Sequence, residues 1–268
     1  MCRTCGCGED EDVRVYEPAE AGHEHPHPRD HEHGHEHGHE HSHEHPNPAS
    51  HSAQARTVEL DVPVLAKNDE LAARNRERLR ELNAFAVNLM SSPGSGKTTL
   101  LERTIRALDG ARPVCVVEGD QETPLDAQRI RATGCRAVQI NTGAGCHLDA
   151  VMFADALDRL RPPADALVLT ENVGNLVCPA LFDLGEQARV VIASVTEGVD
   201  KPLKYPHMFQ SADVLILNKI DLLPYVDFDV EQFAEHARRV NPRVRIMHLS
   251  ATRGDGLGAW TDWLLGRT

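Results

Sequence analysis

The pattern of apolar and polar positions divides the chain into two parts. Up to about residue 56 aliphatic side chains are almost absent, whereas from residue 57 the sequence is an ordinary globular mixture of Val, Leu, Ala and Ile. In this second part short apolar runs alternate with longer helical stretches, which is typical of an α/β protein. The expected strands are 84–90, 113–118, 136–140, 165–170, 189–195, 213–217 and 244–249. The expected helices are 98–108, 124–132, 148–160, 202–210, 229–239 and 256–265.

Apolar strands spaced by helices indicate a largely parallel sheet flanked by helices, although the strand order does not follow from the pattern. One more short strand is expected from the alternation at Val58, Leu60 and Val62. After it, Asn68 or Asp69 is placed to cap a helix that runs to Leu82. We therefore expect one packed domain over 57–268, large enough for a substantial core, behind a disordered tail over 1–56.

Histidine dominates the expected tail. Residues 23–45 read HEHPHPRDHEHGHEHGHEHSHEH, and the tail holds 12 of the chain's 16 histidines. Such a segment has nothing apolar to bury, so conformational entropy favours disorder. The alternatives to metal binding are a purification tag, which the interleaved Glu and the internal position argue against, and a neutral spacer. We interpret the run as a binder of Ni, Cu, Zn or Co. It includes His31, His33, His35, His37, His39, His41 and His43.

The charge balance narrows the range of partners. The formal net charge is −13, which argues against nucleic acid because phosphate neutralisation needs a basic face. No apolar stretch approaches the ~20 residues that a membrane span needs. The first residues, MCRTCGCGEDED, lack the apolar core of a signal peptide. We therefore expect a cytoplasmic protein with reduced thiols and with no nucleic-acid or membrane partner.

A phosphate-binding loop is expected directly after strand 84–90. The segment SSPGSGKTT at 91–99 precedes a helix, so backbone N–H groups at the helix start would face the phosphates. The first glycine of the usual motif is Ser91 here, a change that removes no phosphate ligand. Lys97 would reach the β- and γ-phosphates, and Thr98 would coordinate Mg²⁺. The predicted nucleotide contacts in this loop are Gly94, Ser95, Gly96, Lys97, Thr98 and Thr99.

Two later strand ends predict that the bound base is guanine. Strand 213–217 leads into NKID at 218–221, and the last strand ends in LSAT at 249–252. The Asp221 carboxylate would accept hydrogen bonds from guanine N1–H and N2–H₂, whereas the N1 acceptor of adenine would repel it. NKxD alone is weak evidence, but three such elements in GTPase order at strand ends are strong. The predicted contacts are Asn218, Lys219, Asp221, Ser250 and Ala251.

A γ-phosphate sensor and an acidic group near Mg²⁺ are expected between these elements. The segment TENVG at 170–174 resembles a D-x-x-G switch with Glu171 in the Asp position. The Gly174 N–H would meet the γ-phosphate, and Glu171 would hold Mg²⁺ through water. Asp120, in VEGDQET, is the other candidate for holding Mg²⁺ or positioning water, although either carboxylate could be a solvated strand-end charge. The predicted catalytic residues are Lys97, Thr98, Asp120 and Glu171.

The N-terminal cysteines indicate a metal site. Cys2, Cys5 and Cys7 offer three thiolates within six residues, and the C-x-x-C spacing lets two sulfurs reach one ion. A thioredoxin-like redox pair is the alternative, but that pair starts a helix in a βαβ unit.

A second group of candidate ligands lies in the domain. Cys146 and His147 precede helix 148–160, and Cys178 lies four residues after Gly174. Two thiolates and an imidazole suit Ni²⁺ or Zn²⁺. Buried cysteines are more often small apolar side chains, the interpretation given to Cys115 and Cys135, and spacing alone leaves both readings of the second group open.

The chain resembles the HypB family of hydrogenase nickel-incorporation GTPases over nearly its whole length. The resemblance rests on the N-terminal cysteines, the His-rich tail and six further segments. These segments are SSPGSGKTTL at 91–100, EGDQET at 118–123, TGAGCHLDA at 142–150, ENVGNLVCPALFDLG at 171–185, TEGVDKPLKYP at 196–206 and NKID at 218–221. The related urease-accessory GTPase shares the P-loop class but lacks the cysteine motif and the Cys-His followed by ENVGNLVCP.

This resemblance implies a GTP-dependent homodimer, with GTP and Mg²⁺ as cofactors, that binds nickel and delivers it during maturation of nickel–iron hydrogenase. The implied partners are an accessory protein of the HypA type and the hydrogenase large subunit. The implied metal sites are a tight nickel site at Cys2, Cys5 and Cys7 and a site for Ni²⁺ or Zn²⁺ at Cys146, His147 and Cys178. Alternatives are a urease-type nickel accessory GTPase, a nickel-storage protein with a nucleotide-regulated site, and a small-molecule kinase of the P-loop class.

Deletion of residues 23–45 tests the interpretation of the tail. We expect the number of nickel ions bound per chain to fall by several while GTP hydrolysis is unchanged, because the segment is expected to pack on nothing. Equilibrium dialysis and a phosphate-release assay measure the two quantities. A large loss of GTP hydrolysis would contradict an independent tail.

Overall fold

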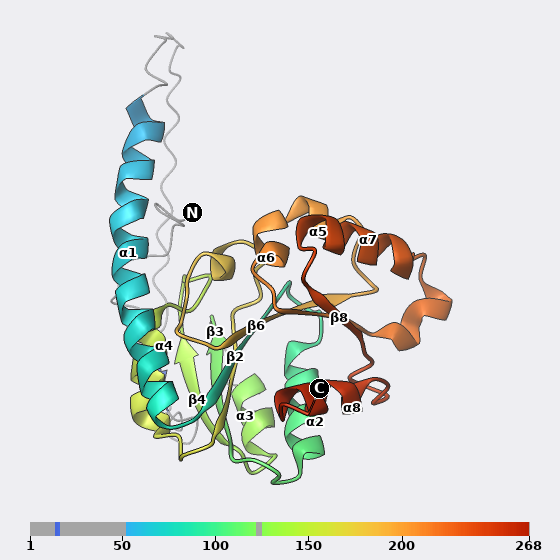
Figure 1. Ribbon diagram of the computed structural model, residues 1–268, viewed down its shortest axis with the longest axis horizontal. Helices are drawn as coiled ribbons and strands as arrows, with labels where there is room; N and C mark the ends of the chain where they lie inside the picture. Colours follow the sequence, from blue (N-terminus) through green and yellow to red (C-terminus); the bar gives the residue numbers. More distant parts are fainter. Residues whose placement is uncertain (1–13, 17–51, 122–124, 268) are drawn as a thin grey trace, which may run out of the picture.

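An eight-stranded sheet forms the centre of the computed structural model, which describes residues 14–16, 52–121 and 125–267 (Figure 1). The strand order is β1-β4-β3-β5-β2-β6-β7-β8, and every pair is parallel except β1 with β4. The strands are β1 Arg14–Tyr16, β2 Phe85–Ser91, β3 Val114–Asp120, β4 Arg136–Asn141, β5 Leu167–Glu171, β6 Ala188–Ser194, β7 Val214–Asn218 and β8 Arg245–His248.

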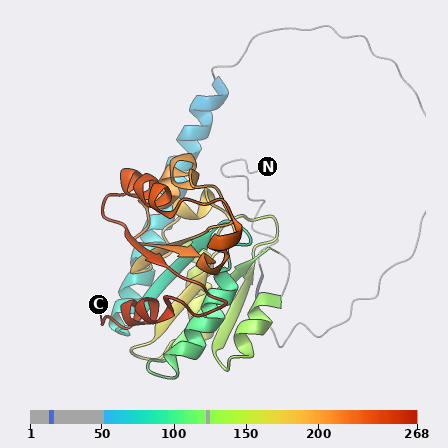
Figure 2. The same cartoon turned by 90° about the vertical axis from the view of Figure 1, so that its right-hand side faces the viewer.

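Helices cover both faces of the sheet (Figures 1 and 2). The α-helices are α1 Ser52–Glu81, α2 Lys97–Leu108, α3 Leu125–Arg131, α4 Ala150–Leu160, α5 Lys201–Lys204, α6 Pro206–Gln210, α7 Val230–Val240 and α8 Leu257–Leu264. Two 3₁₀ helices are η2 Cys178–Ala180 and η3 Ile220–Tyr225. Apolar side chains of α2, α3 and α8 pack on one face, while those of α1 and α4, and of α6 and α7, form two clusters on the other.

The expected fold class is confirmed. All seven predicted strands of the domain are present within a few residues of their predicted ends. Alternate side chains of the same strand pack into the cores on opposite faces of the sheet. The predicted helix 202–210 is two short helices, α5 and α6, because Pro206 has no N–H with which to continue the first.

The expected strand at Val58, Leu60 and Val62 is wrong, and so is the helix start at Asn68 or Asp69. Helix α1 begins at Ser52 and includes all five positions. Residues 58 and 62 are also four apart, a spacing that fits one helix face as well as an alternating strand. Asn68 therefore lies inside the helix, where its side chain is buried. Helix α1 crosses the boundary expected at residue 56, and the division into tail and domain stays a prediction.

The expectation that the tail packs on nothing is wrong for residues 14–16. These residues form β1, which pairs antiparallel with β4, with Arg14 opposite Asn141 and Tyr16 opposite Gln139. Strand β4 would otherwise be the edge of the parallel sheet, and its unpaired N–H and C=O groups are a template for an added strand. The histidine run and Cys2, Cys5 and Cys7 lie outside the described residues.

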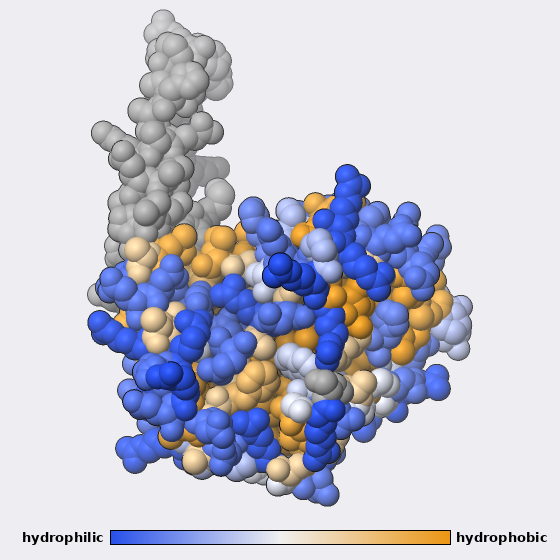
Figure 3. Space-filling model, in the orientation of Figure 1, coloured by the Kyte–Doolittle hydropathy of each residue, from blue (hydrophilic) through white to orange (hydrophobic). Residues whose placement is uncertain are grey.

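None of the helices within 52–121 and 125–267 is long and apolar enough to cross a membrane. On the face drawn in Figure 3, polar and charged side chains predominate and apolar ones gather in small groups.

Helix α1 runs beside α4 along one flank, and its N-terminal part projects beyond the sheet (Figures 1 and 2). The loop after η2 approaches the C-terminal half of α1 at Gly185, whose φ is +95°. A Cβ atom there would lie 2.5 Å from the Ala72 carbonyl oxygen and 2.7 Å from the Asn75 Cβ atom. Only glycine permits this close contact between α1 and the loop after η2.

Replacing Gly185 by Ala tests this packing. We expect the free energy of unfolding to fall by about 1–2 kcal/mol for the left-handed backbone and by a further ~1–3 kcal/mol for the clash with α1. Gly134→Ala is the matched control, since φ is +83° there and a Cβ would meet nothing within 4 Å. Denaturant titration measures both variants, and equal losses would contradict the close contact.

Candidate functional site

The loop between β2 and α2 lines one end of a cavity of about 520 Å³. Gly94 and Gly96 have φ values of +73° and +98°, which the tight turn requires. A Cβ at Gly96 would lie 2.6 Å from the Asn218 Nδ2 atom, so this glycine also permits contact between two motifs. The first N–H groups of α2 lie at the same end of the cavity, where the helix dipole favours an anion.

Ser91 organises the loop side chains. Its Oγ accepts hydrogen bonds from Lys97 Nζ at 2.8 Å and from Ser95 Oγ at 2.6 Å. Burial lowers the pKa of Lys97 from its ordinary value, against the attraction of Glu171 and Glu118. The serine that replaces the usual first glycine thus holds the lysine ammonium group at the cavity.

Asn218 joins the phosphate loop to the two loops expected to contact the base. Its Nδ2 donates to Ser95 O at 2.9 Å, and its Oδ1 accepts from Ala251 N at 3.0 Å. Lys219 Nζ donates to Gly94 O at 2.7 Å. Ser250 Oγ donates to the Asp221 carboxylate at 2.6 Å, which fixes the orientation of that group. The three predicted motifs therefore meet at the carboxyl ends of β2, β7 and β8.

Three carboxylates gather in the cavity: Glu118, Asp126 and Glu171. Glu118 and Glu171 are opposite each other on β3 and β5 and are buried. Each offers an Oε2 atom without a hydrogen-bond partner, while Thr98 Oγ1 donates to Glu171 Oε1 at 2.8 Å. A hydroxyl beside unsatisfied carboxylate oxygens is the donor set that Mg²⁺ prefers, so the residues fit that ion.

Burial controls the protonation of this cluster. Burial, followed by the neighbouring Glu171 carboxylate, raises the pKa of Glu118 to about 9. Burial raises the pKa of Glu171 to about 7, although Lys97 and the Thr98 hydroxyl act in the opposite direction. Two facing carboxylates without a cation retain a proton near neutral pH, and a bound cation would displace it.

Sequence reasoning did not select Glu118, Asp126 or Arg129, all of which line the cavity. Asp120 lines it as well but is not one of the three clustered carboxylates. The signal for Glu118 was available, since a Glu inside the apolar run VCVVEGD is costly to bury without a partner. Nothing in the local pattern distinguishes Asp126 and Arg129 from the exposed charges of a helix.

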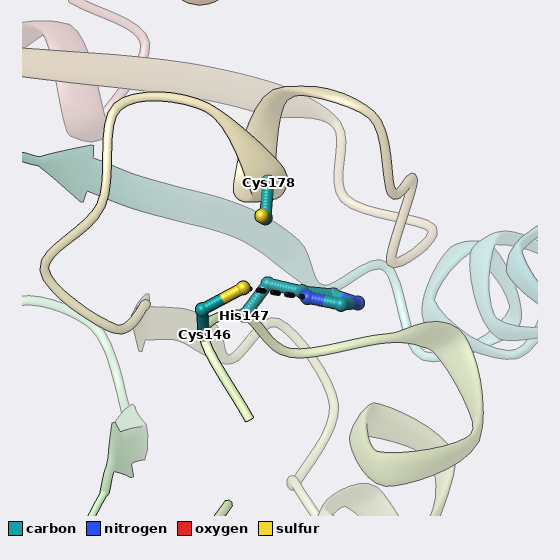
Figure 4. Close-up of side chains that lie close together, drawn as sticks. All are labelled: Cys146, His147 and Cys178. Atoms are coloured by element: carbon teal, nitrogen blue, oxygen red, sulfur yellow. Dashed lines mark hydrogen bonds between the residues drawn. The ribbon is translucent and has the colours of Figure 1, made fainter. Parts of the chain in front are cut away.

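Cys146, His147 and Cys178 lie together, each offering one ligand atom within 4.8 Å of the others (Figure 4). Cys146 and His147 come from the loop before α4, and Cys178 begins η2. Figure 4 shows the Cys178 sulfur directed toward the other two side chains, and Cys146 Sγ lies 3.7 Å from His147 Nδ1. The three side chains that sequence spacing left open are therefore brought together by the fold.

The environment favours the metal-binding form of His147. Its ring stacks on Phe182 with centroids 3.9 Å apart. Burial lowers the pKa of His147 to about 4, so the imidazole is neutral and can donate a lone pair to a metal. Cys178 is 8% exposed, whereas Cys146 is half-buried, which leaves the cluster open on one side.

The segment after β5 connects this cluster to the cavity. Gly174 packs on Pro93 of the phosphate loop, since a Cβ there would lie 3.1 Å from the Pro93 Cα atom. The buried Asn172 Oδ1 accepts from Leu148 N at 3.1 Å. Asn175 Nδ2 donates to Cys146 O at 3.3 Å. One stretch of chain therefore contacts the phosphate loop and the Cys146 loop, and continues to Cys178.

A parallel sheet with a phosphate loop after β2, a switch-like segment after β5 and joined motifs after β7 and β8 defines a P-loop GTPase. A family model described as the nucleotide-binding domain of CobW/HypB/UreG matches residues 85–248. The chain belongs to this family and, within it, to the hydrogenase maturation factors HypB.

Two relatives and one solved structure illustrate the membership. Hydrogenase maturation factor HypB from Azotobacter vinelandii is 58% identical over 212 residues, covering 79% of this chain and 70% of the relative. The hydrogenase/urease maturation factor HypB from Helicobacter pylori is 41% identical over 215 residues, covering 78% and 88%. The crystal structure of HypB from Helicobacter pylori in complex with nickel has a TM-score of 0.72 at 41% identity, covering 75% of this chain and 94% of that one.

Asp221→Asn tests recognition of the base. We expect GTP affinity to fall roughly 10- to 150-fold, the equivalent of one hydrogen bond to a charged group. Affinity for xanthosine triphosphate should rise, because the new amide can donate to xanthine O2. Asp227→Asn, an exposed carboxylate nearby in the chain, is the control for loss of charge. Unchanged discrimination between the two nucleotides would show that Asp221 does not contact the base.

Proposed function

We propose that the protein uses GTP binding and hydrolysis to control a nickel ion held by Cys146, His147 and Cys178, and that it delivers nickel for maturation of a nickel–iron hydrogenase. The observation that carries this proposal is the segment from Glu171 to Cys178. It contacts the phosphate loop at one end and supplies a ligand to the metal cluster at the other.

The nucleotide would occupy the cavity above the phosphate loop. In this assignment Lys97 and the first N–H groups of α2 bind the phosphates, and the Gly174 N–H meets the γ-phosphate. Asp221 reads guanine, with Ser250 fixing its carboxylate and Asn218 holding the surrounding loops in place. Further contacts with the nucleotide would come from Ser95, Thr99, Lys219 and Ala251.

Mg²⁺ would be held by Thr98, by Glu171, to which the Thr98 hydroxyl donates, and by Glu118, which lies opposite Glu171. When bound, the ion neutralises charge on the phosphates. Asp120, at the end of β3 on the cavity wall, remains a candidate for holding Mg²⁺ or for positioning the attacking water. Buried carboxylates that retain protons without a cation exchange those protons for the ion, so nucleotide–Mg²⁺ binding should release protons.

Nickel is the proposed cargo. Two thiolates and a neutral imidazole are suited to Ni²⁺ and also to Zn²⁺, and a similar structure is that of a HypB in complex with nickel. Cys2, Cys5, Cys7 and the histidine run would supply a second site and a nickel store. Both lie outside the described residues and remain predictions.

Loss of the γ-phosphate provides the switch. The Gly174 N–H would lose its partner, and the segment that packs on Pro93 would move. Because Asn172 and Asn175 bind the loop of Cys146, the same movement would change the separation of the three ligands. Metal binding must then alter nucleotide affinity by the same factor.

A homodimer is the proposed working form, formed in the presence of GTP. Val151, Val177 and Leu181, which flank the ligands in sequence, are 47%, 54% and 46% exposed. Large exposed apolar side chains beside a half-open metal cluster favour contact with another protein surface there. An accessory protein of the HypA type and the hydrogenase large subunit are the proposed partners, as the membership in the HypB family suggests.

A role in urease maturation is a second candidate, since the relative from Helicobacter pylori is named a hydrogenase/urease maturation factor. Nickel transfer assays with each apoenzyme as acceptor separate the two roles. A passive nickel store would show the same nickel release with GTP as with GDP.

Nickel titration in each nucleotide state tests the coupling. The full chain with Cys2, Cys5 and Cys7 changed to Ser should bind nickel at the remaining thiolates with an affinity that differs about 5- to 150-fold between a non-hydrolysable GTP analogue and GDP. The absorbance of sulfur-to-nickel charge transfer reports these thiolates and is silent to the histidine run. Cys178→Ala should remove the difference while leaving GTP affinity nearly unchanged.

Cys135→Ala is the matched control, because this half-buried thiol binds the Val114 carbonyl away from the cluster. It should leave the nucleotide-dependent difference intact. Equal nickel affinity in the two nucleotide states of the parent would overturn the switch mechanism.

A further inference from the structure

Asn68 and Asn75 face the protein interior from the same side of α1, about two helical turns apart. They are only 6% and 5% exposed. An asparagine is costly to bury unless its amide is hydrogen-bonded, so the partners of these two side chains identify what they do.

Each of the two amides joins the same two loops. Asn68 Oδ1 accepts from Ala150 N at 2.9 Å, and its Nδ2 donates to Asp183 O at 2.9 Å. Asn75 Nδ2 donates to Ala150 O at 2.8 Å and to Leu184 O at 2.9 Å. The two side chains therefore bind both backbone groups of Ala150 and two successive carbonyls of the other loop.

These loops carry the metal ligands. Ala150 begins α4 three residues after His147, and Asp183 follows Cys178 by five residues. Phe182, next to Asp183, stacks on the His147 ring. A shift of either loop relative to α1 would therefore change the separation between Cys178 and the pair Cys146 and His147.

Two further contacts hold α1 against the loop that follows Cys178. Arg76 donates from Nη2 to both carboxylate oxygens of Asp183, at 2.8 and 2.7 Å. Gly185 permits the close approach to the Ala72 carbonyl described above. None of these α1 side chains lines the nucleotide cavity.

We propose that Asn68 and Asn75 are positioning residues of the metal site, which hold the loop of Cys146 and His147 at a fixed distance from the loop of Cys178. This inference rests on the proposed function, because it takes the three side chains as ligands. Helix α1 is then the element that connects the N-terminal part of the chain to the geometry of the metal site.

Nickel binding to the full chain with Cys2, Cys5 and Cys7 changed to Ser provides the test, with free nickel set by a chelator buffer. Asn68→Asp keeps the acceptor for Ala150 N and loses the donor to Asp183 O. Asn75→Leu keeps the branched shape and the number of heavy atoms and loses both donors. We expect each to weaken nickel affinity about 10- to 100-fold, as loss of supporting partners does at metal sites. Each should also shift the sulfur-to-nickel charge-transfer band.

Arg78→Ala is the matched control. Arg78 lies on the same helix and binds Asp158 and Leu157 O at the far end of α4. It should change neither nickel affinity nor the band. GTP affinity without nickel should be the same in all variants, since none of Asn68, Asn75 and Arg78 lines the cavity. Asn68→Asp, the smaller change, carries the test if Asn75→Leu fails to fold.

The outcomes separate this inference from the proposed function. One outcome is that the parent shows a charge-transfer band that Cys178→Ala loses, while the asparagine variants keep the nickel affinity and the band of the parent. That outcome would overturn the positioning role alone. Weakening by Arg78→Ala as large as that by the asparagine variants would also overturn it, because general destabilisation would then explain the loss. Absence of the band in the parent would overturn both the metal site and its positioning residues.

Discussion

Loops at the carboxyl end of a parallel sheet carry backbone N–H and C=O groups that the sheet itself cannot satisfy, and this protein satisfies many of them with buried asparagine side chains. Asn218 ties the phosphate loop to the last strand end, and Asn172 binds the loop before α4. Asn68 and Asn75 bind the same loop from α1. Asn218 and Asn68 each donate and accept at once, and Asn75 donates twice, so each of these amides ties together two segments of backbone that are distant in sequence. These cross-links surround the nucleotide cavity and the cluster of Cys146, His147 and Cys178.

The same edge of the sheet concentrates the charged groups of the site. Glu118 and Glu171 face each other on neighbouring strands with Lys97 nearby, in surroundings that raise the pKa of both carboxyl groups. An arrangement that is unfavourable without a cation is suited to binding one.

Short covalent and hydrogen-bonded connections join the nucleotide cavity to the cluster of Cys146, His147 and Cys178. Cys178 at the cluster lies only seven positions after Glu171 at the cavity, and Asn172 and Asn175 lie between them. A movement at the phosphate loop therefore has a direct physical route to the metal ligands. In the proposed mechanism the α1 contacts would oppose such movement. The separation of the three side chains would then depend both on the nucleotide state and on the packing of α1.

The sequence by itself determined the strands, the phosphate loop and the order of the GTPase motifs, because these depend on local periodicity and on turns that only certain residues can adopt. It left open whether Cys146, His147 and Cys178 come together, and it missed Glu118 facing Glu171. The prediction that Asn68 caps the start of a helix was wrong. Only the tertiary structure decided these points, since contacts between loops depend on which strands are neighbours, and hydrophobic periodicity records which face is buried without recording the strand order.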